Sequence, residues 1–161
     1  MGDVGAEPSE SAFRELYDSE FATTVRLARF LTGDAAAAED LAQDSFVRIY
    51  RYLDDPVRPV DDLVGLLRTT TTNVCRSWHR SRRRRDLRMA RHGISVESLT
   101  EWERELDASL RRLPYDQRAV VVLRHWLGWS EAEIAKALEC RPGTVKSRHA
   151  RAIDTLRKEL S

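Results

Sequence analysis

Cysteine is scarce in this chain, with only two among 161 residues. Cys75 and Cys140 lie far apart on helical patterns without metal-ligand spacing, which favours reduced thiols over a disulfide or a zinc site. No apolar run approaches the roughly 18 to 20 residues of a membrane span. The polar, acidic N-terminus lacks the features of a signal peptide. These absences predict a cytoplasmic protein with no metal, no cofactor and no membrane insertion.

Catalytic and phosphate-binding motifs are also missing. The seven glycines form no phosphate-binding loop, and no serine or threonine lies in a nucleophile elbow. The histidines show no HxxxH pattern and no neighbouring carboxylate suited to a metal or a catalytic base; they are His79, His92, His125 and His149. We therefore expect no catalytic residue and no enzyme activity.

Charge is abundant, and the net charge of +1 conceals its segregation along the chain. Residues 1–62 carry 14 acidic and 6 basic side chains, whereas residues 63–92 carry 1 acidic and 9 basic. Residues 93–117 have 6 acidic and 3 basic side chains, and residues 118–161 have 5 and 9. The alternation indicates nucleic-acid contacts at two places and a basic protein partner at another, although solvated helix faces would give the same pattern.

Apolar side chains recur at helical spacing through most of the chain, which predicts an all-α fold. With 42% hydrophobic residues, the chain can bury one modest core or two small ones of roughly 60 to 80 residues each. We expect two small helical domains, over residues 11–85 and 98–161. A flexible tail (1–10) precedes the first domain, and a flexible linker (86–97) joins the two.

Three helices are expected in the first domain. Gly33 ends the first, Asp34 is placed to cap the second, and Asp61 is placed to cap the third. The second helix turns a polar, mainly acidic face outward, formed by Glu39, Asp40, Gln43, Asp44 and Arg48.

The second domain begins with a capping-box pattern at Ser98 and Glu101, and Pro114 ends the helix that follows. A further helix is expected over Gln117–Leu127. Its run AVVVL is strand-like by propensity, but the helical pattern around it favours a buried helix.

The segment Ser130–Arg151 is typical of a DNA-reading helix-turn-helix. Ser130 and Glu133 form a capping-box pattern, and Pro142 opens a second helix after a turn of three residues. The end of the turn and the second helix offer polar and basic side chains that could reach phosphates or base edges: Arg141, Thr144, Lys146, Ser147, Arg148, His149 and Arg151.

An arginine-rich run, SWHRSRRRR, closes the third expected helix. Arginine supplies a fixed charge and a planar donor fork for phosphates, and the indole of Trp78 could stack on an unpaired base. A solvated helix end with Trp78 in the core is the alternative interpretation. The presence of a separate helix-turn-helix favours nucleic-acid contact.

These segments resemble the extracytoplasmic-function class of bacterial sigma factors. LTGDAAAAEDLAQDSFVRIYRYL resembles the region 2 helix that docks on the polymerase clamp, and TTTTNVCRSWHRSRRRR resembles the helix that reads the −10 element. LRRLPYDQRAVVVLRHWLGWSEAEIAKALECRPGTVKSRHARAIDTLR resembles region 4, which reads the −35 element. Together these blocks cover most of residues 11–85 and 107–158.

The resemblance implies a factor that directs RNA polymerase core to promoters and promotes melting at −10. Its implied partners are the clamp and flap of the core, promoter DNA and an anti-sigma factor. The acidic face of the second helix would bind polymerase, and the exposed face of the helix-turn-helix would bind −35 DNA. The implied −10 contacts are Asn73, Arg76, Trp78, Arg80, Arg82 and Arg83.

The chain departs from the family pattern at three places. Glu139 stands where the helix-turn-helix often has glycine, and Thr69–Thr72 replace a more apolar approach to Asn73. The loop Asp54–Val60 falls where the family captures a flipped −10 base, yet it lacks an obvious aromatic residue. The base specificity is therefore open.

Two alternatives use the same residues differently. A stand-alone helix-turn-helix regulator, whose first domain only dimerises, leaves the region 2 signature unexplained. An RNA-binding or recombinase-like enzyme lacks a catalytic constellation.

Overall fold

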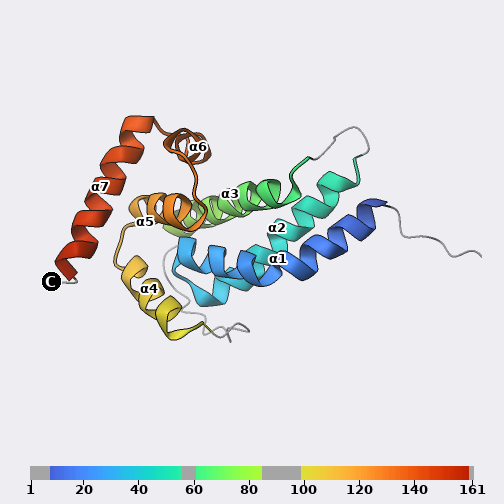
Figure 1. Cartoon of the computed structure of the whole chain (residues 1–161), viewed down its shortest axis with the longest axis horizontal. Helices are drawn as coiled ribbons and strands as arrows, with labels where there is room; N and C mark the ends of the chain where they lie inside the picture. Colours follow the sequence, from blue (N-terminus) through green and yellow to red (C-terminus); the bar gives the residue numbers. More distant parts are fainter. Residues whose placement is uncertain (1–7, 56–60, 85–98, 160–161) are drawn as a thin grey trace, which may run out of the picture.

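The computed structural model describes residues 8–55, 61–84 and 99–159, and all regular structure in these ranges is helical (Figure 1). The all-α prediction is confirmed. The elements are α1 (Pro8–Thr32), α2 (Ala35–Leu53), α3 (Leu63–Arg84), α4 (Glu101–Arg111), α5 (Tyr115–Val121), the π-helical turn η1 (Val122–Trp126), α6 (Glu131–Ala137) and α7 (Pro142–Glu159).

The first helix begins inside the expected tail. α1 starts at Pro8, a residue suited to a first helical turn because it has no amide hydrogen to leave unpaired. Residues 1–7, the expected linker 86–97 and most of the expected base-capture loop lie outside the described residues.

A two-residue connection sets α1 against α2. Gly33 has a φ of +66°, which glycine adopts readily, and its amide donates to the carbonyl of Arg29 at 2.7 Å. The Asp34 carboxylate then accepts the amide of Ala37 at 3.0 Å and caps α2. Both sequence predictions for this connection are confirmed.

The cap of α3 is Asp62, not the expected Asp61. The Asp62 carboxylate accepts the amide of Gly65 at 2.9 Å. Asp61 does not cap the helix because α3 begins one residue later than the sequence pattern suggested.

A small apolar cluster packs α1, α2 and α3 together. It consists of Leu16 in the first half of α1, Phe46 and Ile49 in the second half of α2, and Leu67 of α3.

The capping box of α4 is also shifted from its expected position. Thr100 accepts the amide of Glu103 at 3.2 Å, and the Glu103 carboxylate accepts the amide of Thr100 at 2.8 Å. Two overlapping stretches fit the capping pattern, and the observed one buries Leu99 and places Glu103 3.2 Å from Arg26 of α1. The expected cap at Ser98 is therefore wrong.

The run AVVVL is helical and buried, as predicted. The helix begins at Tyr115, directly after Pro114, and passes into the π-helical turn η1. The amide of Leu127 there donates to the carbonyl of Val122 at 3.3 Å, five residues back. The sequence pattern did not indicate this widened turn.

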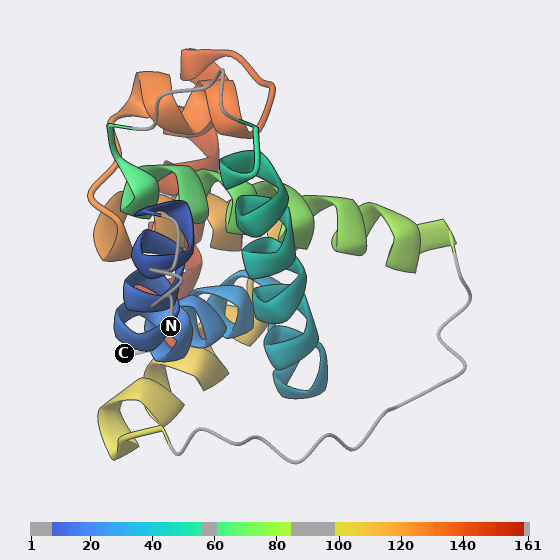
Figure 2. The ribbon, with the colours of Figure 1, turned by 90° about the vertical axis from the view of Figure 1, so that its right-hand side faces the viewer.

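One hydrophobic core joins the N-terminal helices to the C-terminal ones. It includes Val74 and Cys75 of α3 together with Leu110 of α4 and Ile134 of α6. Figures 1 and 2 show α5 and α6 lying against α1 and α3. The two halves of the described chain are therefore packed together.

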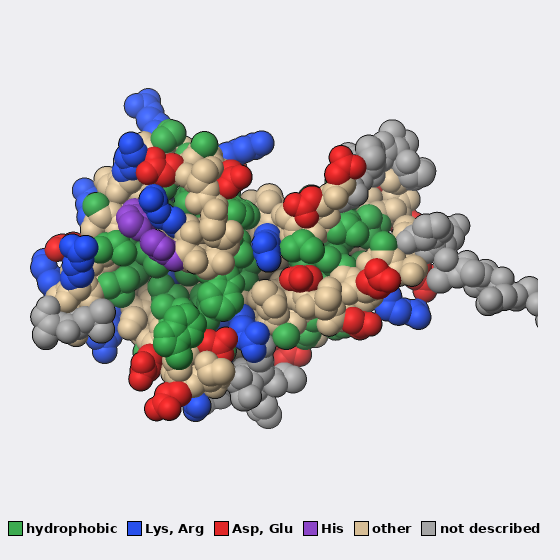
Figure 3. All heavy atoms as spheres, in the orientation of Figure 1, with side chains coloured by type: hydrophobic (Ala, Val, Ile, Leu, Met, Phe, Trp, Pro, Cys, Tyr) green, Lys and Arg blue, Asp and Glu red, His purple; other side chains and the backbone are tan. Residues whose placement is uncertain are grey.

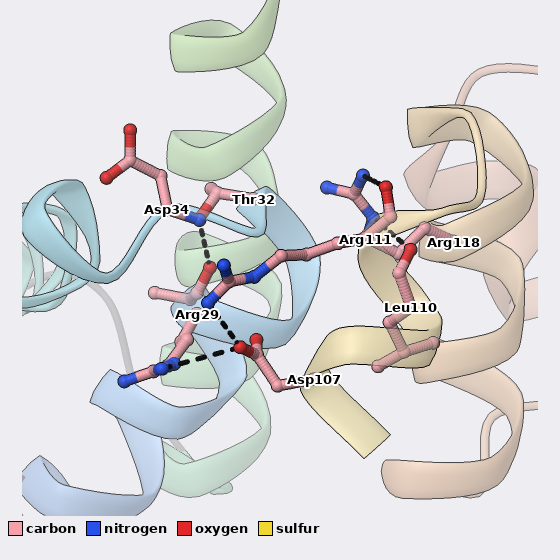
Figure 4. A network of polar contacts seen from close by, with 8 residues as sticks. Arg29, Thr32, Asp34, Asp107, Leu110, Arg111 and Arg118 are labelled. Carbon is pink, nitrogen blue, oxygen red and sulfur yellow. Dashed lines mark hydrogen bonds and ion pairs between the residues drawn. The ribbon is translucent and has the colours of Figure 1, made fainter. Parts of the chain in front are cut away.

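A polar network lies beside this core (Figure 4). The buried Asp107 carboxylate accepts a hydrogen bond from Arg111 at 2.6 Å and another from Arg29 of α1 at 3.4 Å. Arg118 donates to the carbonyls of Leu110 at 2.9 Å and of Leu31 at 3.5 Å. Burial lowers the pKa of Arg118, and these carbonyls stabilise its charge. The network links α1 to α4 and α5.

Candidate nucleic-acid interface

The helix-turn-helix has the predicted local structure. Ser130 caps α6 by accepting the amide of Glu133 at 3.2 Å, and the Glu133 carboxylate accepts the amide of Ser130 at 2.8 Å. After the turn, α7 is anchored by Val145 and Ala152, neither of which is exposed to solvent. Because these two residues face the core, the opposite side of α7 faces solvent.

Four of the seven candidate −35 residues are exposed, namely Arg141, Lys146, Ser147 and Arg151. Thr144, Ser147 and Arg151 share one face because they are three, four and seven residues apart. Lys146 lies on another flank, with its ammonium 3.8 Å from the Glu131 carboxylate. On the face shown in Figure 3, lysine and arginine side chains gather around α7.

The other two basic candidates on α7 contact the protein. Arg148 lies 3.5 Å from the Asp116 carboxylate of α5, and the Nε2 atoms of His149 and His125 are 2.9 Å apart. Figure 3 shows histidine side chains grouped beside α7. Partial burial, followed by the charges of Arg124 and His125, lowers the pKa of His149. His149 is therefore mostly neutral near pH 7, and it joins α7 to η1.

The candidate −10 residues are distributed over two sides of α3. Asn73, Arg76 and Arg80 share one face, at spacings of three, four and seven residues. Trp78 lies on the other side, half-buried against the core, with the Arg82 guanidinium 5.1 Å from its ring centre. Arg82 also pairs with Asp34 at 3.1 Å. The structure thus separates Trp78 and Arg82 from the face that contains Asn73.

Arg83 belongs to α3, but its side chain lies outside the described part of the structure. The preceding threonine run is well accommodated in the helix. Thr71 and Thr72 are fully buried, and their hydroxyls donate to the carbonyls of Leu67 and Arg68 at 2.8 Å each. This backbone bonding explains how four consecutive threonines fit into α3.

Arg76 also touches the helix-turn-helix. Its guanidinium donates to the carbonyl of Leu138 at 3.0 Å and lies 3.2 Å from the Glu139 carboxylate. Arg80 lies 3.8 Å from the same carboxylate. Beside this contact, the rings of His79 and Tyr115 stack with their centres 4.0 Å apart. Sequence reasoning did not find this contact, since nothing in the local pattern pairs α3 with the turn before α7.

The acidic face of α2 is exposed as expected. Asp40, Gln43, Asp44 and Arg48 face solvent, whereas Glu39 is half-buried. Asp44 and Arg48 form an ion pair of 3.5 Å along the helix.

Val47 and Tyr50 lie exposed on the same side of α2, 46% and 52% accessible respectively. The sequence interpretation did not single out these two residues. Both lie outside the apolar stripe of α2, and that position predicts exposed apolar side chains.

Two family profiles match nearly all of the helical chain. Sigma-70 region 2 matches residues 16–85, and Sigma-70, region 4 matches residues 103–156. The ECF RNA polymerase sigma factor SigL of Mycobacterium tuberculosis is 34% identical over 171 residues, which cover 97% of this chain and 93% of SigL. The chain belongs to the extracytoplasmic-function (ECF) sigma factors. The RNA polymerase sigma-E factor of Streptomyces avermitilis is 36% identical to this ECF sigma factor, over 92% of the chain and 84% of the relative.

Solved structures of sigma factors share the fold of this ECF sigma factor. RpoE of Bartonella quintana, solved with the anti-sigma factor NepR, has a TM-score of 0.69 and 26% identity, over 93% of this chain and 97% of that one. CnrH, solved with the cytosolic domain of CnrY, has a TM-score of 0.62 and 26% identity, over 93% and 88%.

The described residues show neither a metal site nor a membrane span. They contain no cluster of three or more potential metal ligands, and Cys75 and Cys140 are free thiols. None of the helices in this part of the chain combines the length and apolar content needed to cross a bilayer.

Proposed function

We propose that this ECF sigma factor directs RNA polymerase core to specific promoters and promotes melting at the −10 element. The observation that carries the proposal is the presence of regions 2 and 4 in one chain, at residues 16–85 and 103–156. The region 2 match disfavours a stand-alone regulator, since a dimerisation domain would not need a polymerase-binding signature. The factor acts by binding, so we assign it no catalytic residue.

Three surfaces of the chain, on α7, α3 and α2, have separate binding roles in this proposal. On α7, Ser147 and Arg151 enter the major groove of the −35 element, and Lys146 reaches the groove from another flank of the helix. Arg141 and Thr144 contact phosphates. Arg148 and His149 support this face from its flanks, because their side chains contact α5 and η1.

The α3 face of Asn73, Arg76 and Arg80 engages the opened −10 strand, where flipping a base costs a few kcal/mol that protein contacts must offset. Trp78, with Arg82 against its ring, packs on the core behind that face. Arg83 extends the basic run.

On α2, the acidic face of Asp40, Gln43, Asp44 and Arg48, with Glu39 at its edge, docks on the polymerase clamp. The exposed Val47 and Tyr50 supply apolar area at the centre of that contact, as interface cores commonly require. Region 4 would approach the flap of the polymerase.

We place the two domains at residues 11–85 and 98–161. We place the protein in the cytoplasm, where an anti-sigma factor would control it.

In vitro transcription on a promoter library tests this function. With purified core polymerase, the chain should yield transcripts from a defined promoter class. The double variant Asp40→Lys, Asp44→Lys should abolish transcription and co-elution with core while keeping its helical circular dichroism, because both side chains are exposed. The matched control reverses Glu15 and Asp18, exposed carboxylates of α1, and should retain activity. Palindromic duplex binding without core, and no transcripts with it, would favour the regulator instead.

A further inference from the structure

Glu139 has an unusual backbone conformation. It lies in the turn between α6 and α7 with a φ of +49°, and among the described residues other than glycine no other has a positive φ. Only a few per cent of residues other than glycine adopt this left-handed region. A helix-turn-helix often has glycine at this place, so the turn itself requires the positive φ. Glutamate here adds a carboxylate that glycine would not supply.

The Glu139 carboxylate faces the candidate −10 surface of α3. It lies 3.2 Å from a guanidinium nitrogen of Arg76 and 3.8 Å from one of Arg80. Arg76 is well enclosed, with 16% of its side chain exposed, and it also donates to the carbonyl of Leu138 at 3.0 Å. Arg76 and Arg80, both candidate −10 contacts, therefore each pair with a carboxylate of the same chain.

This contact conflicts with reading two promoter elements at once. Elements centred at −10 and −35 are about 25 base pairs apart, or roughly 85 Å along B-form DNA. The 18 residues of α7 span only about 27 Å. With α3 in direct contact with the turn that opens α7, the two candidate reading faces cannot reach both elements.

We propose that Glu139 is an intramolecular substitute for a DNA phosphate, which holds the free chain closed by occupying Arg76 and Arg80. We call this contact the Glu139 latch. It rests on the −10 role proposed above for the α3 face. Polymerase and promoter DNA open the chain by drawing α3 and α7 to separate sites, and the arginines then exchange the carboxylate for phosphate oxygens, to which guanidinium binds in the same way.

Cys75 provides a native reporter of opening. It is fully buried, and burial raises the pKa of its thiol to about 12. Tyr115 of α5 lies close enough for the two groups to interact electrostatically, and its ring stacks on His79 one turn further along α3. Separation of α3 from α5 would expose Cys75 and restore its reactivity, since the thiolate is the nucleophile.

The test is maleimide labelling of Cys75 in the full chain, without DNA or polymerase, in a background that carries Cys140→Ser. Glu139→Gln and Glu139→Gly should each raise the labelling rate about fivefold, which corresponds to an exposed ion pair of about 1 kcal/mol. Glu105→Gln, which removes the same charge from an exposed site on α4, should label like the parent.

Urea unfolding of the same proteins separates opening from general destabilisation. Glu139→Gly should be at least as stable as the parent because glycine accepts the positive φ without strain. Arg76→Glu should also speed labelling, and adding Glu139→Arg should restore protection.

Equal labelling of the Glu139 variants and the Glu105 control would overturn the latch. Faster labelling of Glu139→Gly with a matching loss of stability would overturn it too, because the residue would then be merely structural. A third outcome separates the two proposals. If the Glu139 variants label faster without a loss of stability, but the chain supports no transcription with RNA polymerase core, the latch stands and the proposed function is contradicted.

Discussion

Arg151 is the side chain on which −35 recognition depends most in this account. It is exposed, it shares a face with Ser147 and Thr144, and its guanidinium can bind guanine through two hydrogen bonds. The sequence alone placed it correctly on the solvent side, because the apolar positions of α7 fix the helix orientation.

Replacing Arg151 with alanine should weaken binding to a −35 duplex by about 1 to 3 kcal/mol and relax discrimination at one base pair. Titration of labelled duplexes that vary at each position measures both effects. Lys158→Ala removes one positive charge from the far end of α7 and serves as the control. Equal losses in the two variants, with unchanged sequence preference, would show that Arg151 contributes charge alone.

His149 makes stability depend on pH. Its pKa in the folded chain lies below the ordinary 6.5, mainly through burial and then through Arg124 and His125, while Glu131 opposes the shift. The unfolded chain therefore takes up the proton first as the pH falls. The stabilisation is complete above pH 6.5 and is lost as the pH falls from there through the lower folded value.

Urea unfolding between pH 7.5 and 5 should show this loss, and His149→Gln should flatten the profile because no imidazole remains to be protonated at that position. The same protonation places a positive charge in the His125–His149 contact, whose Nε2 atoms are 2.9 Å apart. A profile with the same slope in the parent and in His149→Gln would contradict this assignment.

At the scale of elements, local chemistry predicted the helices well and their first residues less well. The roles of Gly33 and Asp34 were predicted correctly. A glycine that ends one helix, followed directly by an aspartate that caps the next, leaves only one possible position for the boundary. The caps of α3 and α4 were misplaced because neighbouring residues offered a second cap of the same kind. Tertiary contacts decide between such alignments, as the burial of Leu99 shows.

Replacing Gly33 with alanine should lower the free energy of unfolding by about 1 to 2 kcal/mol. Its φ is +66°, and an added Cβ would lie 2.9 Å from the Arg118 guanidinium. Gly143→Ala is the matched control, since a Cβ there meets nothing within 4 Å and alanine favours the helix. Denaturant unfolding at neutral pH compares them. A Gly33→Ala chain as stable as the control would show that the α1–α2 connection tolerates another conformation.

At the scale of the molecule, sequence motifs identified the two reading regions but not their mutual packing. Arg76 and Glu139 are 63 positions apart, and neither belongs to a pattern that would pair them. The core shared by Cys75 and Ile134 likewise depends on long-range contacts, which periodicity along one helix cannot reveal. The separation of Trp78 from Asn73 required the observed helix orientation.

The central claim is that one chain, closed when free, opens to read two promoter elements with polymerase. Spin labels at Ser19 of α1 and Ala132 of α6, both exposed, measure this directly in a chain carrying Cys75→Ala and Cys140→Ser. We expect one short separation in the free protein, and a separation longer by roughly 30 Å or more in the promoter complex with core, given about 85 Å between the elements. The same distance in both states would contradict the account.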